Sequence, residues 1–118
     1  MQTLIILWEP NDKWKALSDS EQKDYLRKLD TIIAEARAHG VMTLGWSKID
    51  HGLSRAAEQG YVGVFAMTNE EQIRGLDESV QQADWYDYFD SVNVSINPQG
   101  GTNALPSEEY ARILGMEL

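Results

Sequence analysis

Short apolar runs alternate along the chain with longer stretches of helical spacing. Residues 3–8 form an aliphatic run with β-branched content and end before a proline-containing turn, which predicts a buried strand. Residues 41–48 and 61–68 predict two further strands. Residues 91–97 alternate apolar and polar side chains, as a fourth strand does. The connection over residues 49–60 contains two glycines, and we expect a short helical turn at 54–59.

Two stretches between these strands carry helical signals. Ser18 and Glu21 fit a capping box, in which each side chain satisfies a backbone donor of the first turn. Gly40 supplies the stop of this first helix. A second capping box, from Thr68 to Glu71, opens the second helix. The apolar residues of the two helices recur at helical spacing: Leu26, Leu29, Ile33 and Ala36 in the first, and Ile73, Leu76, Val80 and Ala83 in the second.

The predicted order of elements is β-α-β-β-α-β, which is the ferredoxin-like unit. The sequence therefore predicts an α+β fold with an antiparallel sheet and two helices on one face. We assign residues 1–97 to this domain and residues 98–118 to a C-terminal extension. Gly100 and Gly101 help to end the fourth strand, and a short helix capped by Ser107 and stopped by Gly115 follows. We expect the extension to cover its own subunit rather than a partner.

The second face of this sheet needs a cover, because the first strand is apolar on both faces. Soluble monomers avoid a large exposed apolar patch, so we expect a homodimer with the two sheets face to face. In the fourth strand, Val92, Val94 and Ile96 point one way, and Ser91, Asn93 and Ser95 point the other way. If the apolar set packs on the helices, the polar set faces the partner, which predicts a partly polar space between the sheets.

This pattern resembles the dimeric α+β barrel superfamily, in which two ferredoxin-like units pack sheet to sheet. The segments that carry a narrower resemblance, to small bacterial members of unknown function, are Leu7-Trp8-Glu9-Pro10, Trp14, Leu17-Ser18, Trp85-Tyr86-Asp87-Tyr88-Phe89 and Val92-Asn93. The resemblance implies a pocket between sheet and helices in each subunit. The superfamily includes cofactor-independent monooxygenases, heme-degrading monooxygenases, isomerases and cyclases. The heme-degrading members use a His on the second helix, and residues 69–84 contain none.

Composition and charge exclude several classes of function. The formal net charge of −9 argues against a nucleic-acid or anionic-membrane surface, and most of the acidic excess falls in residues 69–90. The chain has no Cys, no apolar stretch long enough to span a bilayer and no basic leader at its N-terminus. We therefore expect a cytoplasmic protein. The two His residues show no metal-ligand spacing, and no phosphate-binding motif is present, so we expect no metal and no cofactor.

The aromatic residues and one amide are the candidates for a ligand site. We expect Trp8, Tyr25, Trp46, Tyr61, Phe65 and Asn93 to line the pocket, although large aromatic side chains are first of all core material. His51 lies in the loop after the second strand and is a candidate general base at the pocket mouth, or an ordinary surface His. His39 ends the first helix, where a cation is favourable. The resemblance to monooxygenases implies that Asn93 could bind a substrate carbonyl beside the ring of Trp46 or Trp8.

Three functions remain open at this point. The first is a homodimeric protein that binds a small apolar or aromatic molecule between sheet and helices. The second is an enzyme that oxygenates, isomerises or cyclises an aromatic or polyketide-like substrate without a cofactor, with His51 and Asn93 as catalytic residues. The third is an interaction module that docks another protein through its acidic helix.

Overall fold

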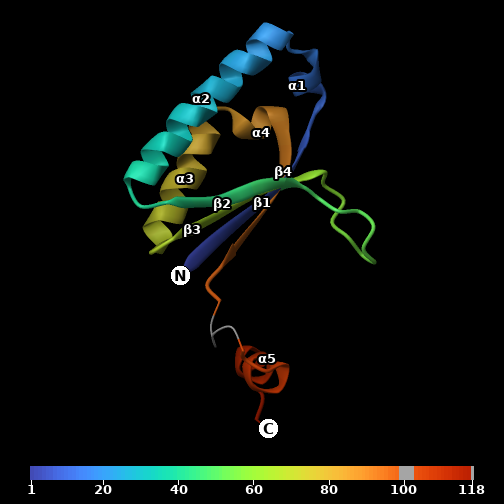
Figure 1. Ribbon diagram of the computed structural model, residues 1–118, viewed down its shortest axis with the longest axis vertical. Helices are drawn as coiled ribbons and strands as arrows, with labels where there is room; N and C mark the ends of the chain where they lie inside the picture. Colours follow the sequence, from blue (N-terminus) through green and yellow to red (C-terminus); the bar gives the residue numbers. More distant parts are fainter. Residues whose placement is uncertain (99–102, 118) are drawn as a thin grey trace.

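The computed structural model describes residues 1–98 and 103–117, and within them four strands form one antiparallel sheet. The strands are β1 (Gln2–Pro10), β2 (Met42–Lys48), β3 (Tyr61–Met67) and β4 (Phe89–Ile96), in the spatial order β2-β3-β1-β4. The two long helices, α2 (Asp19–Ala38) and α3 (Glu70–Gln82), lie together over one face of the sheet (Figure 1). The predicted ferredoxin-like α+β fold is confirmed.

The capping box at the start of α2 forms as predicted. The Ser18 hydroxyl accepts from the backbone N–H of Glu21 at 3.1 Å, and the Glu21 carboxylate accepts from the backbone N–H of Ser18 at 2.9 Å. That backbone N–H is the main reason why the pKa of Glu21 lies below its ordinary value. The helix ends at His39, and Gly40 follows with φ +97°, a conformation that glycine adopts without a steric cost.

Two short helices were not predicted as separate elements. The proline-containing turn leads into α1 (Asp12–Ala16), because the Asn11 side chain accepts from the backbone N–H of Trp14 at 3.1 Å and caps a single turn. The aromatic cluster after α3 forms its own helix, α4 (Trp85–Tyr88), after Asp84 reverses the chain with φ +62°. The helical turn expected at residues 54–59 is absent, and that segment consists of bends and turns.

The helix α3 begins one residue later than the sequence pattern indicated. Asn69 is the N-cap, and its side chain accepts from the backbone N–H of Gln72 at 3.1 Å. The Gln72 side chain accepts in return from the N–H groups of Thr68 and Asn69. The expected pairing of Thr68 with Glu71 was therefore wrong by one position. Asn is a stronger N-cap than Thr, which explains the shift.

The core lies between the helix face of the sheet and α2 and α3. Strand β1 contributes Leu4 and Ile6, and β3 contributes Phe65 and Met67, all at 5% exposure or less. They pack against residues of the helices and of the segment that follows α3: Tyr25, Ile73, Leu76, Val80, Trp85 and Phe89. The apolar stripe predicted for α3 is thus buried against the sheet.

The expected orientation of β4 was wrong. Ser95 pairs with Leu4 and Asn93 with Ile6, so these polar residues share the helix face of the sheet with the core. Val94 pairs with Ile5 and Val92 with Leu7, which places the apolar set on the opposite face. The alternation of β4 was read correctly, but alternation alone cannot say which set faces the helices. The middle of the outer face is consequently apolar, without the expected polar side chains of β4, and Glu9 and Asp90 lie on the same face toward its end.

The C-terminal helix α5 (Pro106–Leu114) stands away from the sheet and from the other helices (Figure 1). Pro106 occupies its first turn after Leu105, so Ser107 is not the cap, whereas Gly115 ends the helix as predicted, with φ +69°. Contrary to the expectation that the extension covers its own subunit, its described helix α5 does not pack over the sheet or over α2 and α3, and Tyr110 and Ile113 are more than half exposed (Figure 1). Gly100 and Gly101 lie outside the described residues. No helix within the described ranges is long and apolar enough to cross a bilayer.

Candidate functional site

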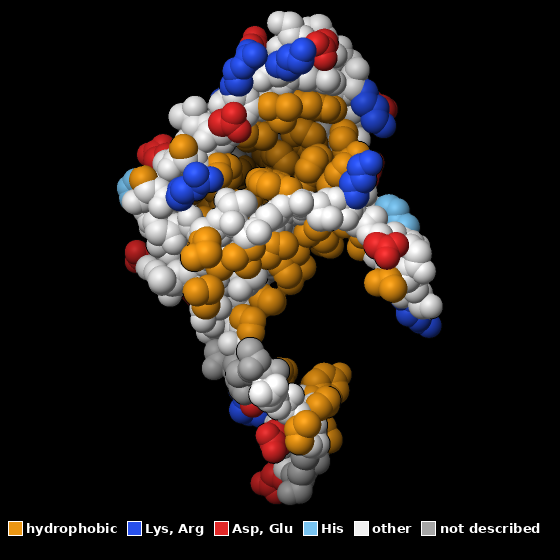
Figure 2. All heavy atoms as spheres, viewed as in Figure 1, with side chains coloured by type: hydrophobic (Ala, Val, Ile, Leu, Met, Phe, Trp, Pro, Cys, Tyr) orange, Lys and Arg blue, Asp and Glu red, His pale blue; other side chains and the backbone are white. Residues whose placement is uncertain are grey.

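A cavity of about 660 Å³ lies between the helix face of the sheet and α2. It opens between α2 and the edge strand β2, where a hollow lined with hydrophobic side chains is visible on the molecular surface (Figure 2). Charged side chains stand around the margin of this hollow. The lining residues are Ile6, Trp8, Leu26, Leu29, Asp30, Ile32, Ile33, Ala34, Arg37, Thr43, Trp46, Phe65, Leu76, Val80, Trp85 and Phe89.

Aromatic rings form much of the cavity wall, and they hold one another in place. The ring of Trp8 stacks on that of Tyr61 with centroids 4.6 Å apart, and the rings of Trp85 and Phe89 meet Trp8 edge-on. The buried indole N–H of Trp8 has no hydrogen-bond partner among the described residues. An unsatisfied buried donor costs about 1–3 kcal/mol, so packing rather than hydrogen bonding positions this ring.

Trp46 enters the cavity from the edge strand because β3 leaves room for it. A Cβ added to Gly63 would lie 2.6 Å from the Trp46 ring, so the absence of a side chain at Gly63 lets the indole lie flat on the strand. The ring then meets Phe65 edge-on with centroids 5.2 Å apart. Trp46 remains 52% exposed, which places an accessible aromatic surface beside the cavity opening.

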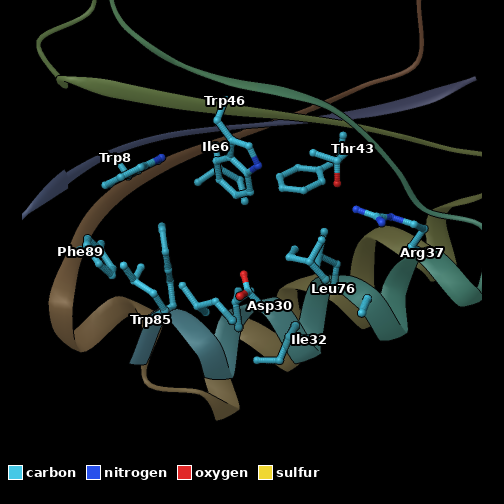
Figure 3. Close-up of a pocket in the computed structure, with 16 residues that line it drawn as sticks. Ile6, Trp8, Asp30, Ile32, Arg37, Thr43, Trp46, Leu76, Trp85 and Phe89 are labelled. Carbon is cyan, nitrogen blue, oxygen red and sulfur yellow. The ribbon is translucent and has the colours of Figure 1, made fainter. Parts of the chain in front are cut away.

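Three polar side chains interrupt the apolar lining. Asp30 and Arg37 come from α2, and Thr43 comes from β2 (Figure 3). Within the part of the chain that the structure describes, none of the three has a side-chain hydrogen bond or an ion pair. Asp30 and Arg37 are two helical turns apart, about 10 Å along the axis, and do not pair with each other. A small number of polar groups in an apolar pocket is typical of a small-molecule site, because such groups orient the ligand.

The structure places three of the predicted ligand residues in this cavity: Trp8, Trp46 and Phe65. Tyr25 lies behind the wall, where its hydroxyl group donates to the carbonyl of Ala83 at 2.7 Å. Burial and the nearby carboxylate of Asp84 raise the pKa of Tyr25 well above its ordinary value. Tyr61 also lies behind the wall, as the ring on which Trp8 stacks.

Asn93 lies elsewhere, in a smaller pocket of about 200 Å³ between the sheet and α3. Its side-chain amide donates to the Tyr86 hydroxyl at 2.8 Å, and that hydroxyl donates to Asp77 at 2.7 Å. Burial, together with the bond to Asp77, raises the pKa of Tyr86. Neither Trp8 nor Trp46 lines this pocket, so the expected combination of Asn93 with an indole ring is not present in this structure.

His51 is an exposed loop residue that lines neither the main cavity nor the smaller pocket at Asn93. Its Nε2 atom lies 2.7 Å from the carbonyl oxygen of Gln59, a contact that ties the two ends of the β2–β3 loop together. His51 and Asn93 therefore do not share a pocket. His39 lies at the end of α2, where its Nδ1 atom contacts the carbonyl of Glu35 at 2.9 Å, in keeping with the structural role expected of it.

Apart from Tyr25, none of the residues predicted to line the pocket lies on α2 or in the segment after α3, although both segments contribute to the lining. Leu26, Asp30, Ala34 and Arg37 recur every three or four residues and follow one stripe along α2. This spacing was available in the sequence, but a stripe that mixes apolar and charged residues is usual for a solvent-exposed helix face. Trp85 and Phe89 belong to the aromatic segment after α3, and they both pack in the core and line the cavity.

The ionisable groups of the described residues do not gather into a metal centre. No group of three His, Asp or Glu side chains lies close enough to hold a metal ion within residues 1–98 and 103–117. Among the residues that line the main cavity, Asp30 and Arg37 alone are ionisable. An acid–base pair at hydrogen-bond distance is therefore not part of this lining.

Solved structures with a similar fold come from larger proteins. A mutant chlorite dismutase from Candidatus Nitrospira defluvii is 14% identical, with a TM-score of 0.60, and the match covers 82% of this chain and 40% of the other. A heme-binding protein from Thermus thermophilus is 10% identical, with a TM-score of 0.59, and the match covers 94% of this chain and 46% of the other. The chain thus spans less than half the length of either protein. At these identities the likeness is one of fold alone.

A shorter structure also matches, that of a dimeric ferredoxin-like protein of unknown function from Thermobifida fusca. It is 16% identical, with a TM-score of 0.48, and the match covers 82% of this chain and 90% of the other. The two larger structures confirm the predicted resemblance to ferredoxin-like proteins at the level of fold. No curated protein matches the sequence. A family model matches residues 1–107, and the chain therefore belongs to DUF6616, a family of unknown function.

Proposed function

We propose that this protein binds a flat apolar or aromatic small molecule in the cavity between its sheet and α2. The cavity itself carries the proposal. Protein interiors are packed to the density of organic crystals, whereas here about 660 Å³ remains open against five aromatic rings. Ligand pockets for drug-sized molecules have volumes of about 300–1,000 Å³ and a mostly apolar lining.

The positions of the two candidate catalytic residues support ligand binding rather than catalysis. His51 and Asn93 lie on different parts of the molecule, and neither lines the main cavity. A general base needs to reach its proton at about 2.6–3.2 Å or through one water molecule. Asp30 is the only carboxylate of the lining, and no acidic or basic partner lies beside it.

Heme is not the ligand that this lining favours, although one protein of similar fold binds it. Heme iron is held by an axial His, Cys, Met or Tyr side chain. The residues that the structure places around the main cavity include none of these four types. A planar apolar molecule without a metal fits the indole and phenyl surfaces better.

The protein is proposed to act as a homodimer through the outer face of its sheet. This face carries Ile5, Leu7, Val62, Val64, Val92, Val94 and Ile96, together with Met42 of the edge strand. Val92, Val94 and Ile96 are 46%, 37% and 38% exposed in the single chain. A continuous apolar sheet face of this kind is typical of an interface, and a second copy offers a matching surface by symmetry.

A fluorescent apolar probe tests the binding proposal directly. N-phenyl-1-naphthylamine is neutral, carries two aromatic ring systems and gains fluorescence in an apolar site. We expect saturable binding to the wild-type protein and loss of binding in Ala34→Phe, because the new ring occupies the cavity. Ala38→Phe places the same ring one helical turn away, outside the lining, and should bind the probe as the wild type does.

Native mass spectrometry of protein purified without added ligand complements this titration. A mass above that of two chains, reduced to two chains in Ala34→Phe, would support a ligand carried from the cell. The proposal fails if the probe does not bind, or if Ala34→Phe and Ala38→Phe bind it equally well.

A further inference from the structure

The polar groups of the main cavity are not spread evenly over it. Arg37 lies in the last turn of α2 and extends toward Thr43 across the opening between helix and sheet (Figure 3). Within the described residues, the Arg37 guanidinium group has no hydrogen-bond acceptor and no carboxylate partner. The Thr43 hydroxyl group has no hydrogen-bond partner there either. Two hydrogen-bond donors without a partner among the described residues thus lie at the same end of an apolar cavity.

Two other cations of α2 have a carboxylate partner, whereas Lys28, like Arg37, has no ion pair among the described residues. Lys23 pairs with Asp19 at 2.9 Å, and Arg27 pairs with Asp24 at 2.9 Å. Both partners lie one turn earlier on the same helix. For Arg37 the corresponding positions are Ile33 and Ala34, which have no carboxylate to offer. Arg37 is exposed at the cavity opening, so its guanidinium group can bind a ligand without first breaking an ion pair.

The geometry points to a ligand that carries one oxyanion group on its flat apolar body, and this inference rests on the proposed binding function. The planar guanidinium of Arg37 binds an oxyanion through parallel N–H donors, and the Thr43 hydroxyl is a further donor at the same end. The rings of Trp46 and Trp85 point into the cavity (Figure 3), and Phe65 also lines it, so these rings would contact the apolar body of the ligand.

Asp30 favours one orientation of such a ligand in the cavity. It lies on the same stripe of α2, about 10 Å from Arg37 along the helix axis. Its carboxylate disfavours a second anionic group at that end and accepts a hydroxyl or amino group of the ligand. The preferred class is therefore an apolar ring system with its single anionic group toward Arg37.

Two probes with the same ring systems separate this inference from the proposed function. 1-Anilinonaphthalene-8-sulfonate carries a sulfonate, and N-phenyl-1-naphthylamine has the same rings without it. Both are titrated by fluorescence against the wild type, Ala34→Phe, Arg37→Gln and Arg27→Gln. The Arg27→Gln variant removes the same charge from the same helix, outside the cavity, and so controls for net charge.

We expect the wild type to bind the sulfonate probe more tightly than the neutral one, and Ala34→Phe to weaken both. Arg37→Gln should lower the affinity for the sulfonate probe about tenfold and that for the neutral probe by much less. Arg27→Gln should change either affinity by less than about twofold, since surface charges are screened.

The inference is overturned, with the proposed function intact, if the neutral probe binds and the sulfonate probe binds no better. It is also overturned if Arg37→Gln weakens both probes equally, because Arg37 then acts only on the shape of the site. Failure of the neutral probe to bind at all contradicts the proposed function instead.

Discussion

The hydroxyl group of Tyr25 connects the two long helices at the back of the cavity wall. It donates to the carbonyl of Ala83, which ends α3, across a separation of 58 positions in the chain. The phenol ring packs edge-on against Trp14 and Tyr88. This contact fixes how α3 meets α2, and thereby supports the cavity without lining it.

We expect Tyr25→Phe to lower the free energy of unfolding by about 1–2 kcal/mol, because the buried carbonyl of Ala83 loses its side-chain donor. Urea denaturation followed by circular dichroism at neutral pH measures this difference. Affinity for the neutral probe should change little, since the Tyr25 side chain does not line the cavity. An unchanged free energy of unfolding would contradict the role assigned to the hydroxyl group.

The same residue predicts a pH dependence at alkaline pH. Burial raises the pKa of Tyr25 in the folded protein, whereas in the unfolded chain it ionises near pH 10. Above about pH 10 the unfolded state loses this proton while the folded state keeps it, so stability falls as pH rises. The stability difference between the wild type and Tyr25→Phe should therefore narrow from pH 9 to pH 11. A constant difference over that range would contradict the raised pKa.

At the scale of single elements, local side-chain chemistry determines where the helices begin. The reciprocal hydrogen bonds of Ser18 and Glu21 open α2, and those of Asn69 and Gln72 open α3. Each pair satisfies backbone donors that the first turn of a helix leaves without partners. The start of α2 matters for the proposed site, because α2 carries both ionisable residues of the lining.

Ser18→Ala should lower the free energy of unfolding by about 1 kcal/mol through loss of the cap. Ser20→Ala on the first turn is a matched control, since Ser20 is exposed and Ala has the higher helix propensity. Thermal denaturation of the two variants beside the wild type measures both effects. Equal melting temperatures for Ser18→Ala and Ser20→Ala would show that the capping box contributes nothing to stability.

At the scale of the whole molecule, the two faces of one sheet serve different purposes. The helix face encloses the cavity and the core, and the outer face is apolar and open in the single chain. Because the cavity opens between α2 and the edge strand β2 on the helix side of the sheet, a dimer formed through the outer face would leave this opening free. Each subunit of the proposed homodimer thus keeps its own binding site.

Val94→Lys places a charge at the middle of β4 on this outer face, and we expect it to convert the dimer into a monomer. Sedimentation velocity at micromolar concentration distinguishes the two states. Ser20→Lys introduces the same charge on an exposed helix position and should leave the dimer intact. A wild-type protein that sediments as a monomer, or a Val94→Lys variant that stays dimeric, would exclude this interface.

Most of the elements follow from local patterns in the sequence. The apolar runs, the capping box of α2 and the glycine stops of α2 and α5 predicted the strands and helices near their observed positions. These signals are local, because a cap or a stop acts within one helical turn. The errors were local too: Asn69 competed with Thr68 as a cap, and Asn11 opened a turn of helix where only a break was expected.

The sequence by itself determined the α+β fold, the order of its elements and the presence of aromatic residues suited to a pocket. Only the tertiary structure decided which face of β4 meets the helices. A strand that alternates apolar and polar residues does not itself indicate which set packs on the helices until its register with β1 is known. The strand order separates Asn93 from Trp46, because β3 and β1 lie between their two edge strands. The long loop after β2 holds His51 away from both. The cavity itself depends on how α2 lies across the sheet, a long-range packing outcome that no local pattern encodes.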